Sequence, residues 1–199
     1  MNPKSFTELL DRFNHGELFK FLYFWGHQPQ ANGLISKSCF SQWYEAPFEA
    51  DGIRYPTAEH FMMAAKARLF NDKATLDKIL TSTNPGAAKA YGREISGFVE
   101  KIWERQRLDV VIQANLLKFS QHPYLREFLL RTGSQVLVEA SPTDRIWGVG
   151  LSAGDPDIHN PNRWKGANLL GFALMAVREE LQDGMNFLPA SCADAAPLR

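Results

Sequence analysis

The chain has 199 residues, 45% of them hydrophobic, and its 22 basic residues balance 22 acidic ones. This length predicts one domain, and this composition is sufficient for a sizeable hydrophobic core. A net charge of zero argues against a large electrostatic footprint for duplex DNA or for an anionic membrane, so no stable nucleic-acid complex and no membrane association are expected. A local phosphate pocket remains compatible with this balance.

The cysteines and the first residues of the chain limit the remaining classes of protein. Cys39 and Cys192 lie far apart, and the sequence has no CxxC motif and no paired His/Cys spacing. We therefore expect neither a structural disulfide nor a metal site, and we predict no cofactor. The first residues form no long apolar run, and no stretch reaches the roughly 18 apolar residues that a membrane helix needs. The expectation is a cytoplasmic protein, whose oligomeric state the sequence leaves open.

The first half of the chain alternates helical patterns with short apolar or hairpin-like stretches. Helical spacing of apolar residues predicts an amphipathic helix over residues 4–13, and the aromatic run over 20–26 predicts a buried strand. Asp51-Gly52 is a hairpin turn signal between two short strands. Thr57 is a suitable N-cap for a helix over residues 58–70.

The second half is dominated by helices. The patterns and capping residues predict helices over 74–82, from Asn84-Pro85 toward Gly92, over 98–119, from Pro123 to Gly133 and over 166–182, with a strand over 135–140 and a long loop over 141–163. Loops of this length are often functional. We predict a mainly α (α+β) single domain over residues 1–182 and a flexible C-terminal tail over 183–199. The sequence has no GxGxxG and no GxxxxGK[ST] motif, which excludes the usual nucleotide-binding signatures.

The first candidate site is the segment from Tyr55 to Lys66. Glu59 falls in the first turn of its predicted helix, where the helix dipole favours a carboxylate. Lys66 follows seven residues later and returns to the same face, at about 100° per residue. The two side chains are thus predicted to line one pocket wall with methionines between them, although a helix-end charge and a solvated lysine would give the same pattern. His60 points away from Glu59, which favours a structural, hydrogen-bonded histidine.

The second candidate site is the start of the long loop, where Asp144 precedes Trp147, Gly148 and Gly150. Glycines permit close approach of the backbone, a tryptophan offers a stacking face, and an aspartate accepts hydrogen bonds from ribose hydroxyls. This combination suits a sugar or nucleotide site. A structural turn capped by Asp144 is the alternative.

The third candidate site is the long helix, on which Trp103 and Arg107 share one face and Lys118 follows near the end. An arginine on such a face is costly to bury alone, so a carboxylate or a phosphate is expected to meet it. Arg93, at the end of the preceding helix, is another candidate phosphate donor. The segments 24–27 and 40–44 are rich in aromatic residues and fit either a stacking surface or core packing.

Together these segments resemble the YbiA-like family, also called NADAR. The matching pieces cover nearly all of residues 20–181 in order: FLYFWG, FSQWYEAPFEADGIRYPTAEHFMMAAKA, AKAYGR, W-E-x-x-R, NLLKF, LLRTG, LVEASPTDRIWGVGL and WKGANLLGFALMAVR. The PTAEHF…AAK run and the DRIWGVG run are the most specific. The resemblance implies a helix-rich α+β fold, in agreement with the predicted elements.

The resemblance also implies an N-glycosidase. Members of the family hydrolyse the C–N bond between ribose 5-phosphate and the pyrimidine of early riboflavin-pathway intermediates, and others remove ADP-ribose from guanine bases. It further implies that Glu59, Trp103 and Asp144 are functional residues and that Lys66 traps the opened sugar in the ADP-ribose branch. The expected substrate is thus a ribosylamine phosphate or an ADP-ribosylated guanine.

Two chemical routes fit these residues. A carboxylate near C1′ can stabilise the developing positive charge and activate water, with Glu59 and Asp144 as candidates. Alternatively, Lys66 can attack the opened sugar and form a Schiff base. Trp103 or Trp147 would stack on the base, Gly148 would allow close approach, and Arg93, Arg107 or Lys118 would bind phosphate. A module that binds ADP-ribose or a related nucleotide without turnover is the competing class.

Overall fold

The computed structural model describes residues 2–186, and within this range the protein is mainly helical. The helices and strands lie where the sequence patterns predict them, within a few residues at each end. They are α1 (Phe6–Asn14), β1 (Phe21–Phe24), β2 (Phe48–Ala50), β3 (Ile53–Tyr55), α2 (Ala58–Leu69), α3 (Lys73–Thr81), α4 (Pro85–Arg93), α5 (Glu100–Gln121), α6 (Pro123–Leu130), β4 (Val136–Glu139) and α7 (Leu169–Asn186). The predicted α+β class with few short strands is confirmed.

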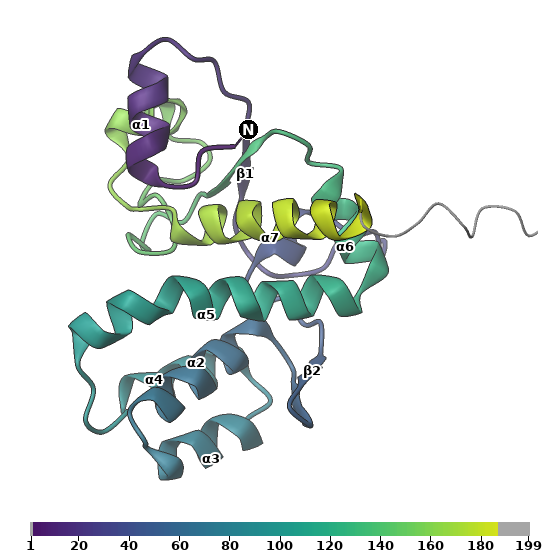
Figure 1. Cartoon of the computed structure of the whole chain (residues 1–199), viewed down its shortest axis with the longest axis vertical. Helices are drawn as coiled ribbons and strands as arrows, with labels where there is room; N and C mark the ends of the chain where they lie inside the picture. Colours follow the sequence, from purple (N-terminus) through teal and green to yellow (C-terminus); the bar gives the residue numbers. More distant parts are fainter. Residues whose placement is uncertain (1, 187–199) are drawn as a thin grey trace, which may run out of the picture.

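The long helix α5 is the centre of the arrangement (Figure 1). On one side it packs along α7, and on the other side it contacts α2, which in turn packs against α3 and α4. Its buried face includes Trp103, Val111, Ala114 and Phe119. Because α5 contacts both α7 and α2, it joins the part of the molecule with β1, β4 and α7 to the part with α2, α3 and α4.

The four strands form two separate pairs. β1 and β4 are parallel, with Phe21 opposite Val136 and Phe24 opposite Glu139. β2 and β3 form the predicted hairpin, whose turn residues Asp51 and Gly52 both have positive φ angles of 51° and 75°. The parallel pair is covered by α7, and its two carboxyl ends therefore lie side by side at one edge.

Capping residues fix the helix starts as the sequence predicts. The Thr57 hydroxyl accepts the backbone N–H of His60 at the start of α2, and Asn84 Oδ1 accepts the N–H of Gly86 at the start of α4. Ser5 caps α1 in the same way through the N–H of Glu8. These bonds satisfy N–H groups that have no partner inside a helix.

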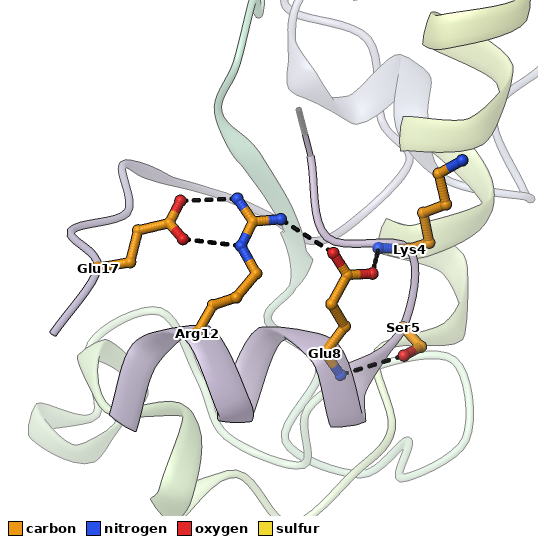
Figure 2. A network of polar contacts seen from close by, with 5 residues as sticks. All are labelled: Lys4, Ser5, Glu8, Arg12 and Glu17. Carbon is orange, nitrogen blue, oxygen red and sulfur yellow. Dashed lines mark hydrogen bonds and ion pairs between the residues drawn. The ribbon is translucent and has the colours of Figure 1, made fainter. Parts of the chain in front are cut away.

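A polar network holds the N-terminal helix in place (Figure 2). The Arg12 guanidinium donates to Glu8 Oε1 at 3.0 Å and to both carboxylate oxygens of Glu17 at 2.7 Å, while the backbone N–H of Lys4 donates to Glu8 Oε2. The apolar side of α1 is fixed by Phe6, whose ring stacks on Trp164 at 5.7 Å. The network therefore sets the path of the chain into β1.

Three short segments differ from the expected loops. The predicted 141–163 loop contains two 3-10 helices, η2 (Pro156–His159) and η3 (Pro161–Arg163), and another 3-10 helix, η1 (Lys37–Phe40), precedes the hairpin. Each starts with a polar side chain that accepts a nearby backbone N–H. Such bonds within two residues produce no hydrophobic periodicity, which explains why the patterns did not predict these turns.

The C-terminal boundary also differs from the expectation. Residues 183–186, which were assigned to the tail, continue α7 in the structure. The rest of the predicted tail, residues 187–199, lies outside the described residues. Among the described helices, none is both long enough and apolar enough to cross a membrane.

Candidate active site

Two neighbouring cavities contain most of the predicted site residues. The first, here called the carboxylate cavity, has a volume of about 570 Å³ and is lined by Trp25, Gly26, His27, Gln28, Ser38, Ser41, Trp43, Lys89, Glu139, Ser141, Thr143 and Asp144. The second, here called the cationic cavity, has a volume of about 420 Å³ and is lined by Lys66, Arg93, Phe98, Glu100, Trp103, Arg107, Ile146 and Trp147. The loop after β4 contributes to both cavities, and so does α4.

The carboxylate cavity lies at the carboxyl ends of the two parallel strands. Trp25 and His27 follow the end of β1, whereas Glu139 is the last residue of β4 and Asp144 lies in the loop that follows. Crevices beyond the carboxyl ends of parallel strands are where open α/β sheets bind ligands, because the loops there are free to vary. The short sheet of this protein thus places its acidic residues where a ligand has access.

The loop after β4 is fixed by its own hydrogen bonds. Asp144 Oδ1 accepts the backbone N–H groups of Ile146 at 2.8 Å and Trp147 at 2.7 Å. Gly148 is buried behind this turn, and a Cβ atom there would lie 2.9 Å from the Glu139 carbonyl oxygen. Gly148 therefore allows close packing of the loop and lines neither cavity. Asp144 is left facing the carboxylate cavity, with Trp147 turned to the cationic one.

Glu59 occupies the first turn of α2, as predicted, and its side chain is buried, with 2% of the residue exposed. Burial raises the pKa of its carboxyl to about 7, against the lowering effects of Lys89 and of a hydrogen bond from Trp43. Its Oε1 atom has no hydrogen-bond partner. Burial therefore outweighs the helix dipole, which favours the ionised form.

Glu59 interacts with charged residues of both cavities. Its carboxyl interacts electrostatically with Lys89 and Asp144, which line the carboxylate cavity, and with Arg93, which lines the cationic cavity. The carboxyl itself is not part of either lining. Its neighbour His60 is buried, and its Nδ1 lies 2.8 Å from the Thr57 hydroxyl oxygen, so the prediction of a structural histidine is confirmed.

Lys66 reaches the cationic cavity from the same helix. Its ammonium donates to the Gly92 carbonyl oxygen at 2.7 Å and lies 4.1 Å from the centre of the Phe98 ring and 5.8 Å from that of Trp103. Burial lowers the pKa of this amine, while the carboxylates of Glu100 and Glu59 act in the opposite direction. Lys66 and Glu59 thus interact through their charges, but they do not line the same wall.

Two predicted phosphate ligands, Arg93 and Arg107, join Lys66 in the cationic cavity. Arg107 lies 3.9 Å from Glu100 and 4.0 Å from Glu104, so carboxylates meet it on the solvent side. The predicted stacking residues Trp103 and Trp147 line the same space. A cavity with three cations and two tryptophans is suited to a phosphorylated sugar or a nucleotide.

Lys118 lies elsewhere. Its side chain is completely buried, and its ammonium donates to the carbonyl oxygens of Cys39 at 2.6 Å and Ser41 at 3.0 Å. Burial lowers the pKa of this amine to about 8. Because Lys118 lines neither cavity, its contacts fit a structural role: it holds the segment that contributes Ser41 to the carboxylate cavity. The spacing on α5 gave no sign of this inward direction.

The structure adds two charged residues that the sequence patterns did not single out. Glu139 lines the carboxylate cavity, and burial, together with the charge of Asp144, raises the pKa of its carboxyl to about 8. Lys89 lies on α4, one turn before Arg93. A charged residue at the end of the apolar run Val136–Val138 is the signal that could have identified Glu139. Trp25, His27 and Trp43, from the aromatic segments, also line this cavity.

The two cavities together provide groups that can transfer protons next to groups that can bind an anion. Glu139 in one cavity and the nearby Glu59 are carboxyl groups with raised pKa values, and the other cavity offers the basic side chains of Lys66, Arg93 and Arg107. Within residues 2–186, no group of three or more His, Cys, Asp or Glu side chains is placed to hold a metal ion. These features suit acid–base chemistry on a phosphorylated substrate.

This helix-rich α+β domain, with a carboxylate cavity beside a cationic one, belongs to the NADAR domain family, whose model matches residues 23–182. Among its relatives, N-glycosidase R617 of Acanthamoeba polyphaga mimivirus is 40% identical over 171 residues, or 83% of this chain and 99% of the relative. N-glycosidase YbiA of Escherichia coli (strain K12) is 35% identical over 142 residues, or 71% and 80% of the two chains.

A solved structure gives the same result for the fold. The NMR structure of the E. coli protein YbiA superposes with a TM-score of 0.69 at 30% sequence identity, and the match covers 90% of this chain and 95% of that chain. The YbiA-like fold expected from the sequence is thereby confirmed.

The buried Glu59 carboxyl makes a testable contribution to stability. Its pKa is about 7 in the folded protein and about 4.3 in an unfolded chain, so wild-type stability falls as pH rises between these values. Glu59→Gln removes this penalty. We expect the variant to be more stable than wild type by about 3–4 kcal/mol at about pH 8, and the difference to fall below about 1 kcal/mol near about pH 4.5.

Urea unfolding at a series of pH values measures this difference. Glu127→Gln, at an exposed position of α6, is the matched control and should show no such pH dependence. A Glu59→Gln variant that is less stable than wild type at the higher pH would contradict the assigned burial cost.

Proposed function

We propose that this chain is an N-glycosidase that hydrolyses the C–N bond between ribose 5-phosphate and the aminopyrimidine of early riboflavin-pathway intermediates. One observation supports it most: two buried carboxyl groups with raised pKa values, Glu59 and Glu139, lie near a cavity that is lined by three basic side chains. The relatives named N-glycosidases, R617 and YbiA, support the same reaction class.

In this proposal the cationic cavity binds the 5-phosphate. Arg93 is exposed at the end of α4, and Arg107 is held by Glu100 and Glu104 at one side. Guanidinium groups bind phosphate oxygens through paired N–H donors, which fixes the orientation as well as the charge. The sugar would then extend toward the loop that contains Asp144 and Trp147.

The carboxylate cavity receives the base. Trp43 and Trp25 offer flat faces, and Gln28, Ser41 and Glu139 offer hydrogen-bonding groups for amino and carbonyl substituents. The reacting bond then lies at the junction of the cavities, next to Glu59. An ionised Glu59 stabilises positive charge at C1′ and takes a proton from the attacking water, and Asp144 accepts hydrogen bonds from ribose hydroxyls.

Lys66 supports a second route at the same position. Its lowered pKa increases the share of neutral amine, which is the nucleophilic form. Once the ribose ring opens, the C1′ iminium is open to attack by this amine, which forms a Schiff base with the sugar and releases the aminopyrimidine. Water then hydrolyses the Schiff base. The hydrogen bond to the Gly92 carbonyl oxygen holds the amine in place.

The size of the cationic cavity favours a second candidate substrate, ADP-ribose linked to guanine. The cavity encloses about 420 Å³ and contains two tryptophans in addition to its cations. A single phosphate does not use these stacking faces, whereas a diphosphate with a purine does. The proposed location is the cytoplasm for either substrate, because phosphorylated metabolites are charged and do not cross membranes unaided.

The direct test is product release. Purified protein is incubated with an aminopyrimidine ribosylamine 5-phosphate and, separately, with ADP-ribosylated guanosine, and free base is measured by chromatography. Wild type should release base from the first substrate, and Glu59→Gln should lose at least about 100-fold in rate while remaining folded. Binding of either compound without release of base would favour the nucleotide-binding module instead.

Lys66 provides the test of the covalent route. With substrate and borohydride, wild type should gain the mass of the reduced sugar adduct, and Lys66→Gln should not. Lys89→Gln, at another amine close to Glu59, is the matched control and should still be labelled. Turnover by wild type with no adduct at any substrate concentration would favour direct attack by water.

Arg93 provides the test of the phosphate site. Arg93→Gln should raise KM for the phosphorylated substrate by about 10- to 100-fold, because one charge-assisted contact is worth about 1.5–3 kcal/mol. The same substitution should leave KM for the dephosphorylated ribosylamine unchanged. Arg105→Gln, at an exposed position of α5 outside the cavity lining, is the control. Equal effects on both substrates would show that Arg93 does not recognise the phosphate.

A further inference from the structure

Glu139 lines the carboxylate cavity, and one of its two carboxyl oxygens has no hydrogen-bond partner. It is the last residue of β4 and lines the cavity beside Asp144. Its Oε2 atom is buried and has no hydrogen-bond partner. A buried carboxyl oxygen without a partner costs free energy, so its retention in a cavity points to a ligand group that completes it.

The backbone on either side of this carboxyl is held firmly. The Glu139 N–H donates to Asn168 Oδ1 at 3.0 Å, and the Glu139 carbonyl oxygen accepts the N–H of Val149 at 3.0 Å. The next N–H, that of Ala140, donates to the Phe24 carbonyl oxygen at 2.8 Å. Asn168 is itself buried and donates to Leu137. The carboxyl thus extends from a rigid strand end, as a group that must meet a substrate atom does.

The charges around Glu139 favour its protonated form. Burial and the carboxylates of Asp144 and Glu59 raise the pKa to about 8, and Lys89 acts in the opposite direction. The other titratable group that lines this cavity is His27. Neighbouring carboxyl groups in a poorly solvated place cannot all be ionised, so one of them keeps a proton at neutral pH.

The other two carboxyl groups are less suited to donate that proton. Asp144 uses Oδ1 to accept two backbone N–H groups and so holds its loop. The charges of Lys89 and Arg93 and a hydrogen bond from Trp43 favour the ionised form of Glu59, which suits it to accept a proton. Glu139 lines the cavity, and its buried Oε2 has no hydrogen-bond partner.

We propose that Glu139 is the general acid of the reaction, a role that rests on the proposed N-glycosidase function. Its carboxyl O–H passes the proton to the base nitrogen bound to C1′ while the C1′–N bond breaks, and the electron pair of that bond stays on the nitrogen. A water oxygen bonds to C1′, and the proton lost by this water goes to the Glu59 carboxylate. Transfer of one proton from Glu59 back to Glu139 through the cavity water restores both groups.

The test compares leaving groups that differ in their need for a proton. On the aminopyrimidine substrate, Glu139→Gln should lower kcat by at least about 100-fold. On 4-nitrophenyl riboside 5-phosphate, whose phenolate leaves without protonation, the same variant should stay within about threefold of wild type. Glu127→Gln, at an exposed position of α6 outside both cavity linings, should match wild type on both substrates. Equal losses on the two substrates, or no loss on either, would overturn the role.

The pH dependence of kcat gives a second and independent test. Wild-type kcat on the aminopyrimidine substrate should fall as pH rises through about 8, because the acid loses its proton there. Glu139→Gln cannot titrate and should lack this alkaline limb, and an unchanged limb in the variant would overturn the role. Failure of the proposed function looks different, since wild type itself would then release no base.

Discussion

The desolvation of the Glu59 carboxyl is the constraint on which the site depends. A carboxylate removed from water costs several kcal/mol unless charges or donors compensate it. Here the compensation comes from the first turn of α2, from Lys89 and Arg93 on α4, and from the Trp43 indole. None of these makes a close ion pair, and so the carboxyl keeps a pKa near neutrality instead of being fixed in its ionised form. A close ion pair would fix the carboxyl in its ionised form and remove the proton transfer proposed for Glu59.

The segment that covers Glu59 is held by α5. The Asn115 side chain donates to Gln42 Oε1 at 2.8 Å, and the Gln42 carbonyl oxygen accepts the N–H of Glu59 at 3.0 Å. Lys118, one turn further along α5, holds the Cys39 and Ser41 carbonyl groups. Removal of either α5 side chain would leave buried polar atoms without partners. The three candidate site residues of α5 therefore have different positions. Trp103 and Arg107 line the cationic cavity, whereas Lys118 holds a segment that lines the carboxylate cavity.

Local patterns predicted the elements because their causes are local. Thr57, Asn84 and the Asp51-Gly52 turn act on backbone groups within three residues, and each lies where the sequence placed it. Glu59 was identified by position and by family resemblance, but its burial was not predicted. Burial depends on α4, α5 and the segment around Trp43, which are distant in the chain.

Contacts between distant segments also explain why the sequence did not predict the positions of Lys118 and Glu139. Lys118 is one of three candidate phosphate ligands in the sequence, because its charge is visible there and its inward direction is not. Glu139 falls within a predicted strand, since one charged residue in a run of four gives no motif. Its significance arises from the parallel pairing of β1 with β4, which places it opposite Phe24 and beside the aromatic residues that follow. That pairing joins segments more than one hundred residues apart and has no local signature.

The two buried glutamates share charged neighbours but differ in the groups that favour ionisation. Burial raises the pKa of both carboxyls, Asp144 raises it further and Lys89 lowers it in both cases. A hydrogen bond from Trp43 and the charge of Arg93 lower the pKa of Glu59, whereas the charge of Glu59 raises that of Glu139. These differences favour ionisation of Glu59 over that of Glu139. In the proposed reaction, this preference gives the site one carboxylate and one carboxylic acid, which is the pairing that cleavage of a glycosidic bond uses.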